Sequence, residues 1–105
     1  MTIPATTPED VSAIVRRAAE ASAVWRRSTI GARVRALGAI ADALDEHADE
    51  LIAEAQRETH LPEPRLRGEV RRTSFQLRLF GEVLEEGTWL DARIDRADGE
   101  WPMGA

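Results

Sequence analysis

The sequence predicts a mainly α-helical chain of 105 residues that forms a single helical segment. Apolar residues recur at intervals of three and four, which is the period of an amphipathic helix. Prolines and glycines fall between these stretches, where turns are expected. The apolar fraction of 43% is sufficient for a folded chain, and the charged fraction of 31% contains no low-complexity run. We therefore expect helices over about 8–27, 30–46, 48–59 and 64–86, and then a short unpartnered strand over about 89–95.

The first helix is predicted from the residues at its start. Thr7 is a typical N-cap residue, and Pro8 suits the first helical position because no backbone donor is needed there. Glu9 and Asp10 follow, where negative charge is favourable beside the positive end of the helix dipole. The expected buried face consists of Val11, Ile14, Val15, Ala18, Ala21 and Trp25. We expect this face to pack against the long helix, with Trp25 in the core.

Two further helices follow a break at residues 28–31, where hydroxyl side chains can cap a helix and Gly31 loosens one. The apolar residues of the second helix are Val34, Leu37, Ile40, Ala41 and Leu44. The pattern changes register around 47–49, and a third run extends to about Thr59 with the apolar residues Leu51, Ile52 and Ala55. Pro62 and Pro64 disfavour helix at the residues before them, so the chain must turn there.

The long helix over 64–86 has apolar residues on two sides. One set follows a narrow stripe: Leu66, Val70, Thr73, Leu77, Phe80 and Leu84. A second set points roughly the opposite way: Phe75, Leu79 and Val83. A helix with two apolar sides tends to lie between two layers, so we expect the second side to lack a partner within this chain.

Beyond Gly87 the residues alternate with a period of two. Trp89, Asp91, Arg93 and Asp95 alternate with Leu90, Ala92 and Ile94, which is typical of a strand. A single strand is not stable alone, because its backbone donors and acceptors require a neighbour. The predicted strand is therefore a second indication that a partner is missing.

Few side chains could carry chemistry. Acidic residues crowd one region without the spacing of a calcium-binding loop: Asp42, Asp45, Glu46, Asp49, Glu50, Glu54 and Glu58. His47 and His60 have no nitrogen or sulfur ligand three or four residues away, as a zinc site requires. We interpret the acids as a solvated face and the histidines as surface or helix-capping residues. No metal site is predicted.

The long helix could also be interpreted as a DNA-recognition helix, because it carries the basic residues Arg65, Arg67, Arg71, Arg72 and Arg78. Arg65 with Glu69, and Arg78 with Glu82, have the spacing of ion pairs on a helix surface. The net charge of −5 also opposes nonspecific affinity for nucleic acid or an anionic membrane. We favour a solvated face, and we expect neither nucleic acid nor a membrane as a partner.

Several catalytic and cofactor motifs do not occur in the sequence. There is no cysteine, so thiol nucleophiles and thiolate ligands are excluded. The glycines form no G-x-G-x-x-G arrangement, and no serine lies in a G-x-S-x-G turn. We therefore predict no catalytic, cofactor-binding or metal-binding residue in this chain. The start has no signal-peptide pattern and no stretch could span a bilayer, which favours a cytoplasmic protein.

Consecutive blocks of the sequence carry a family resemblance. Residues 40–44, 48–52 and 58–59, followed by Leu61 and Pro62, resemble the N-terminal helices of the aldehyde dehydrogenase superfamily. Residues 65–69, 72–73, 76–80 and 86–90 resemble the branch that oxidises α-ketoglutarate semialdehyde. The resemblance covers about residues 10–97. The sequence departs from the family's usual pattern at His60, where glycine is usual, and at Gly81, where alanine is common.

The resemblance implies an N-terminal fragment of an NAD(P)-dependent aldehyde dehydrogenase. Members use a cysteine nucleophile, a general-base glutamate, an oxyanion-hole asparagine and cofactor-binding glycines, and no position here matches any of them. The resemblance thus implies that this chain lacks the catalytic machinery and binds no cofactor, whereas NAD or NADP binds to the complete enzyme. The expected partners are the remaining domains, or a second copy through the uncovered apolar face.

The tail over 98–105 lies outside the resemblance. A truncated or frame-disrupted gene product would explain it, and so would a natural short form. The alternative function, from another class, is a small helical protein-interaction module whose second apolar face binds a partner.

Overall fold

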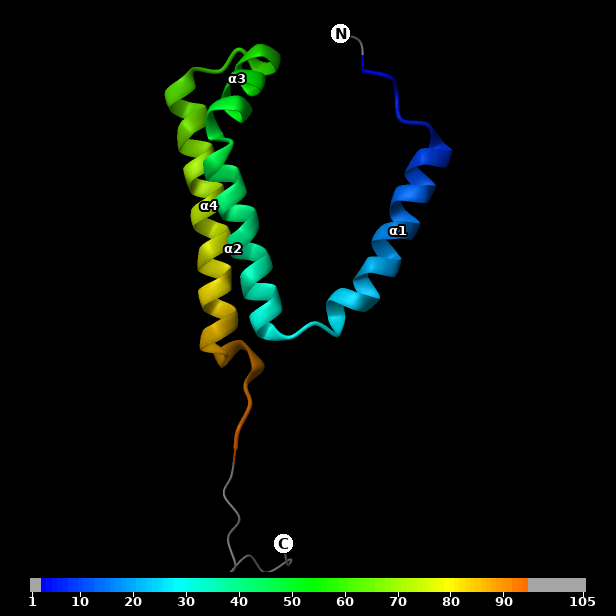
Figure 1. The fold of residues 1–105 in the computed structure, drawn as a ribbon, viewed down its shortest axis with the longest axis vertical. Coiled ribbons are helices and arrows are strands. Elements are labelled where there is room, and N and C mark those ends of the chain that lie inside the picture. Colours follow the sequence, from blue (N-terminus) through cyan, green and yellow to red (C-terminus); the bar gives the residue numbers. More distant parts are fainter. Residues whose placement is uncertain (1–2, 95–105) are drawn as a thin grey trace, which may run out of the picture.

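The computed structural model describes residues 3–94, which form helices and connecting segments without a strand (Figure 1). The elements are α1 (Pro8–Arg26), α2 (Ile30–Glu46), α3 (Ala48–Thr59), α4 (Glu63–Glu86) and the short 3-10 helix η1 (Thr88–Leu90). The mainly α-helical prediction is confirmed. The four predicted helices agree with the observed ones to within one residue at each end.

Side-chain caps begin the first two helices. The Thr7 hydroxyl oxygen accepts a hydrogen bond from the Asp10 backbone N–H at 3.1 Å, and the Asp10 carboxylate accepts from the Thr7 N–H at 3.0 Å. Each residue thus satisfies a donor that the helix leaves free. Thr29 begins α2 in the same way, because its hydroxyl accepts from the Ala32 N–H at 3.1 Å.

The centre of the structure is the α2–α4 pair, two antiparallel helices that lie side by side (Figure 1). The residues buried between them are small: Ala41 is fully buried on α2, and Ser74 and Gly81 are buried on α4. A Cβ atom built on Gly81 would lie 3.7 Å from Val34 Cγ1. Small side chains at these positions allow the two backbones to approach closely.

Helix α3 covers one end of the α2–α4 pair (Figure 1). Ile52 of α3 is only 3% exposed, and Leu66 in the first turns of α4 is also buried. The turn between α3 and α4 uses His60, whose φ of 59° places it in the left-handed region. Its backbone N–H donates to the Gln56 carbonyl oxygen at 2.8 Å, which closes the end of α3.

Helix α1 stands apart from the other helices, and here the packing prediction was wrong (Figure 1). Among residues 3–94 no other helix packs against α1, and none of the residues of α1 is buried. Trp25, which was predicted in the core, is 48% exposed. The period of its apolar residues predicts which face would pack but does not show whether the partner of that face lies in this chain.

The predicted strand is also corrected. Residues 88–90 form η1 and Asp91 is left-handed with a φ of 47°, so the described part of the predicted segment, 89–94, is not a strand. Asp95 lies outside the described residues. No strand elsewhere in 3–94 is available as a neighbour, and without one an extended segment leaves its backbone donors and acceptors unpaired.

The predicted stripe of α4 is correct at four of its six positions, because Leu66 is buried and Val70, Leu77 and Leu84 are half-buried. The other two positions are wrong: Thr73 is exposed, and Phe80 is 59% exposed. Its neighbour Gly81 faces α2 instead. Ser74, next to Thr73, is buried as well, so small residues beside the predicted ones occupy these positions.

Candidate functional site

The apolar face of α1 is the first candidate site, because it is exposed along its whole length. It consists of Val11, Ile14, Val15, Ala18, Ala21 and Trp25. A shallow hollow of about 670 Å³ lies beside the last turns of this helix, and its lining includes Trp25 and the small residues Ala21 and Ser22. Such a continuous apolar face on a helix is typical of a surface that packs against another element.

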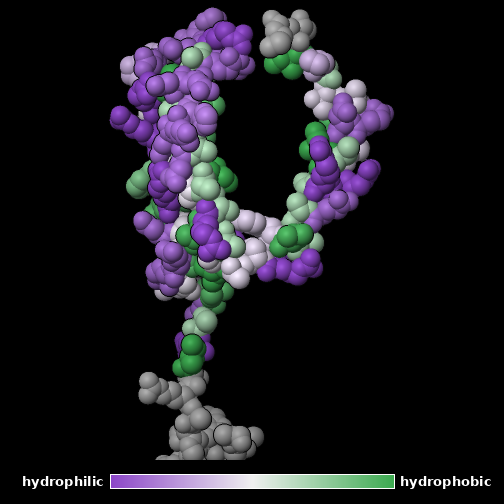
Figure 2. Space-filling view, in the orientation of Figure 1, coloured by the Kyte–Doolittle hydropathy of each residue, from purple (hydrophilic) through white to green (hydrophobic). Residues whose placement is uncertain are grey.

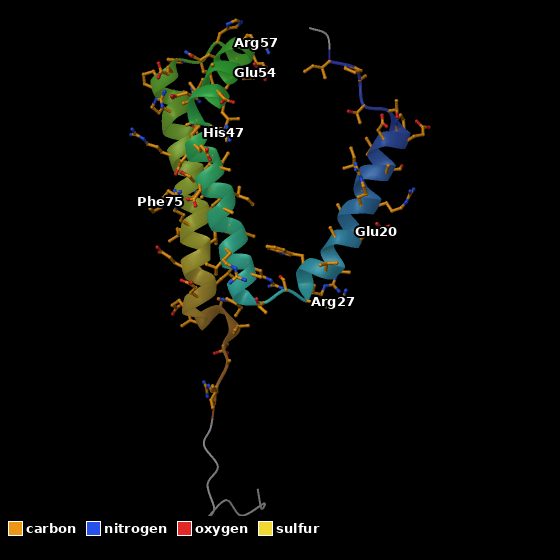
Figure 3. The ribbon with its side chains drawn as sticks, viewed as in Figure 1. Glu20, Arg27, His47, Glu54, Arg57 and Phe75 are labelled. Carbon is orange, nitrogen blue, oxygen red and sulfur yellow. The ribbon has the colours of Figure 1, made fainter. Side chains whose placement is uncertain are left out.

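The outer face of α4, formed by Phe75, Leu79 and Val83, is the second candidate site. Phe75 is 64% exposed and lies on the side of α4 that faces away from α2 (Figure 3). Leu79 and Val83 are also exposed and lie one and two turns further along. This side of α4 is thus exposed among the described residues.

Open space separates α1 from the α2–α4 pair (Figure 2). Apolar patches occur both along α1 and along the edge of the α2–α4 pair (Figure 2). A smaller hollow of about 300 Å³ lies between α2, α3 and α4, where Leu44, Leu51 and Val70 are among its mainly apolar lining residues. These surfaces carry few polar groups, so they suit packing against protein rather than bond-making chemistry.

The acidic residues mostly pair with arginines of α4 and α3. The Arg78 guanidinium lies 2.7 Å from an Asp42 carboxylate oxygen and 2.8 Å from one of Asp45, which ties α4 to α2. The pKa of Asp45 is below its ordinary value, because the nearby Ser74 hydroxyl and then Arg78 favour the charged carboxylate. Arg57 pairs with Glu54 within α3. The arginine of the predicted Arg78–Glu82 pair therefore binds acids of α2 instead.

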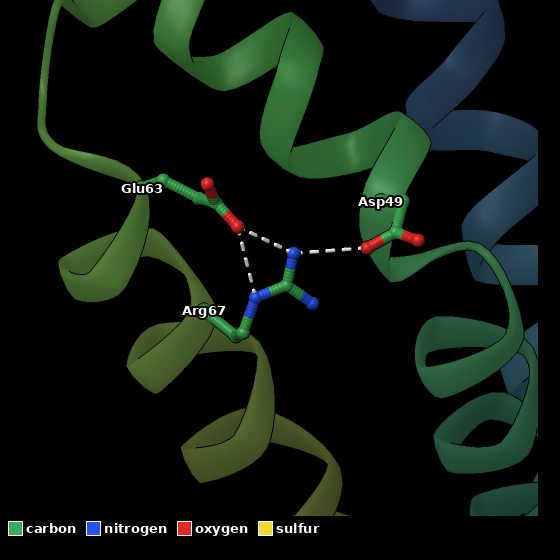
Figure 4. Close-up of polar contacts among 3 residues, drawn as sticks. All are labelled: Asp49, Glu63 and Arg67. Carbon is green, nitrogen blue, oxygen red and sulfur yellow. Dashed lines mark hydrogen bonds and ion pairs between the residues drawn. The ribbon is translucent and has the colours of Figure 1, made fainter.

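A second cluster joins α3 to the start of α4 (Figure 4). Arg67 lies 2.8 Å from a Glu63 carboxylate oxygen and 2.9 Å from one of Asp49. The hydrogen bonds from Arg67, first to Glu63 and then to Asp49, raise the pKa of the guanidinium. Two of the five arginines proposed for a DNA-facing surface are thus engaged with carboxylates.

The two histidines lie at helix ends and are exposed, as predicted. His47 joins α2 to α3, and its Nδ1 is 3.7 Å from a Glu50 carboxylate oxygen. His60 is the residue that ends α3. In residues 3–94 no group of three or more acidic or histidine side chains is placed to hold a metal ion.

A nicotinamide dinucleotide does not fit the residues described. Its pyrophosphate is usually held by a glycine-rich turn between a strand and a helix. Here Gly31, Gly38, Gly68 and Gly81 lie inside helices, Gly87 ends α4, and residues 3–94 contain no strand. No reaction step is therefore assigned to a cofactor on this chain. Within the same residues no helix is long and apolar enough to cross a membrane.

Comparison with known proteins supports the sequence resemblance. The aldehyde dehydrogenase family profile matches residues 1–99. The chain is 43% identical over 88 residues to α-ketoglutaric semialdehyde dehydrogenase 2 of Azospirillum brasilense. This match covers 84% of this chain and 17% of that protein. The chain is 36% identical over 91 residues to α-ketoglutaric semialdehyde dehydrogenase of Acinetobacter baylyi. This match covers 87% of this chain and 17% of that protein. No solved structure matches significantly.

The predicted resemblance to α-ketoglutarate semialdehyde dehydrogenases is therefore confirmed. The chain spans only 17% of the length of these relatives. The family profile, in contrast, covers nearly all of this sequence. The chain belongs to the aldehyde dehydrogenase family.

Proposed function

We propose that this chain serves as the N-terminal helical segment of an NAD(P)-dependent dehydrogenase that oxidises a semialdehyde. The family match and the names of the two relatives support this substrate class. In this proposal the nucleophile, the general base and the cofactor site are supplied by parts of the enzyme outside these residues. The chain contributes packing surfaces, and the assembled enzyme works in the cytoplasm.

The single observation that carries the proposal is the uncovered apolar surface. Helix α1 buries none of its residues, and Phe75 on α4 is 64% exposed. Covering exposed apolar side chains with a partner contributes about 25 cal/mol of favourable free energy per Å² of apolar surface buried. A segment that normally packs between further layers would show this pattern, and it shows it on two different helices.

Complementation tests the proposal directly. The chain is co-expressed with the remainder of the Azospirillum brasilense relative, from which the matched portion has been removed. Formation of NADH or NADPH with α-ketoglutaric semialdehyde is then measured. We expect activity only when both parts are present. If the remainder is fully active alone, or if the chain restores nothing, the proposal fails.

Matched variants show whether the uncovered faces are responsible. Val15→Glu and Phe75→Glu place a charge on the two apolar faces and should abolish complementation. Ala13→Glu and Gln76→Glu add the same charge to exposed positions on the same helices and should leave it intact. Equal effects of both sets would mean that charge alone, rather than the apolar face, matters.

The chain alone is expected to bind neither nucleotide. Calorimetry of the purified chain with NAD and with NADP should give no heat that saturates in the micromolar range. A micromolar dissociation constant for either cofactor would show that the dinucleotide is held by this segment and would contradict the proposed division of roles.

A small helical interaction module is the second candidate function, because the same exposed faces would suit a different protein partner. A segment of a larger enzyme whose packing partners are absent should self-associate or bind an apolar dye when it is isolated. A chain that stays monomeric over a wide concentration range and binds no dye would favour the module.

A further inference from the structure

The connection between α1 and α2 is held by one side chain, Arg33. Within residues 3–94 no other helix packs against α1, and the described hydrogen bonds that join α1 to α2 both come from this guanidinium. One of its terminal nitrogens donates to the Trp25 carbonyl oxygen at 3.1 Å and to the Arg26 carbonyl oxygen at 2.9 Å. These carbonyls belong to the last turn of α1.

Two further contacts fix the same group. The Arg33 Nε donates to the Ser28 hydroxyl oxygen at 3.1 Å, and the Ser28 hydroxyl donates in turn to the Trp25 carbonyl oxygen. The guanidinium carbon lies 5.9 Å from the centroid of the Trp25 ring, which is within the range of a cation–π contact. The side chain is only partly exposed, although it carries a charge.

The chemistry of arginine matches this position. The last carbonyls of a helix have no partner within the helix, and they form the negative end of its dipole. A planar guanidinium presents several donors in a fixed fork, so it can satisfy two neighbouring carbonyls and a hydroxyl at once. A lysine ammonium offers a point charge without that geometry.

We propose that Arg33 is a positioning residue that fixes the direction in which α1 leaves the α2–α4 pair. The capped segment between the helices is short, so its direction is set by the contacts of Arg33 with Trp25, Arg26 and Ser28. The apolar face of α1 is thereby held away from α2 and α4 and stays open to a partner. This inference concerns the isolated chain and is independent of the dehydrogenase function.

The natural absence of cysteine makes a distance measurement straightforward. Spin labels are attached to cysteines introduced at Glu20 on α1 and Glu46 on α2, which are both exposed. The distance distribution between them is compared in the parent chain and in Arg33→Gln. A second labelled pair, at Ala39 on α2 and Glu82 on α4, reports whether the α2–α4 pair remains folded.

We expect the α1–α2 distribution to be narrow in the parent and to broaden toward shorter distances in Arg33→Gln. The α2–α4 distribution and the helix content by circular dichroism should not change. Arg33→Lys should broaden the α1–α2 distribution nearly as much, because an ammonium group lacks the fork of donors of a guanidinium and satisfies fewer acceptors. The matched control Arg35→Gln, on the same helix and exposed, should behave like the parent.

Three outcomes would overturn the inference. The parent distribution could already be as broad as that of Arg33→Gln, which would mean that nothing fixes α1. The Arg33→Gln variant could match the parent, so that other contacts set the direction. Broadening of both labelled pairs would show instead that Arg33 maintains the fold of the α2–α4 pair.

Discussion

Gly81 of α4 faces Val34 of α2 with room for one methyl group between them. A Cβ atom at Gly81 would lie 3.7 Å from Val34 Cγ1, which is an ordinary van der Waals distance. Glycine inside a helix is less favourable than alanine because it loses more backbone freedom on folding. The space at this contact therefore accommodates the methyl group of an alanine.

The first prediction is that Gly81→Ala stabilises the chain. The free energy of unfolding in urea should rise by about 0.5–1 kcal/mol from the change in helix propensity. Gly68→Ala is the matched control, because no side chain or other helix lies within 4 Å of its added Cβ atom, apart from its chain neighbours. If Gly68→Ala stabilises the chain and Gly81→Ala destabilises it, the two helices approach more closely than described.

The second prediction compares the two sides of α4. Leu77 is half-buried against the other helices, so Leu77→Ala should cost about 1–3 kcal/mol, less than the 2–5 kcal/mol of a core leucine. Phe75 is 64% exposed, so Phe75→Ala should cost well under about 1 kcal/mol. Denaturant unfolding of both variants decides it. A similar loss from both would mean that the outer face of α4 is already covered.

The third prediction concerns the left-handed residue that ends α3. His60 has a φ of 59°, a conformation that costs a residue with a Cβ atom roughly 1 kcal/mol more than glycine. His60→Gly should therefore raise the free energy of unfolding by up to about 1 kcal/mol, while greater freedom of the unfolded chain reduces the gain. Gly87→Ala is the reverse test. Gly87 has a φ of 78°, so alanine at this position should lower the free energy of unfolding of the chain. Thermal unfolding of both variants would measure the shifts, and a loss of stability in His60→Gly would show that the imidazole contributes elsewhere.

The fourth prediction concerns acid. The pKa of Asp45 is lowered by the Ser74 hydroxyl and the Arg78 guanidinium. A lowered folded-state pKa gives stability that is present above the unfolded value, about 3.9, and is lost as the pH falls through the folded value. Urea unfolding should therefore show stability that is level near neutral pH and declines below about pH 4.

Asp45→Asn should lower stability at neutral pH and reduce its dependence on acid. Part of that dependence should remain, because the backbone and side chain of Thr7 also lower the pKa of Asp10. Glu46→Gln is the control, since this neighbouring residue is exposed and forms none of the described ion pairs. An unchanged acid response in Asp45→Asn would remove Asp45 as its source.

The helices were predictable because their signals are local. Thr7 and Thr29 begin helices through contacts within one turn, and Pro62 and Pro64 mark the turn before α4. The burial of α1 was not predictable, because Trp25 and its neighbours have an apolar period that is the same whether their partner is in this chain or in another. The exposure of Phe75 was predictable, since it lies opposite the stripe that faces α2.

The strand and two positions of the stripe required information beyond local pattern. A period of two indicates a strand only when a neighbour can accept its hydrogen bonds, and none lies beside residues 89–94 among those described. Phe80 has the hydrophobic character of a core residue, but close approach of two helices selects the small Gly81 beside it. The choice between neighbours depends on the distance between helix axes, which no sequence period contains.

The small size of the residues buried between α2 and α4 has a calorimetric consequence. Ala41, Ser74 and Gly81 remove little hydrocarbon from water, so unfolding hydrates little new apolar surface. The heat capacity of unfolding and the denaturant m-value both scale with that surface. Stability should therefore vary only gently with temperature and urea, and unfolding should extend over a wide range. Covering the open faces of α1 and α4 by a partner would raise both quantities and make the transition sharper.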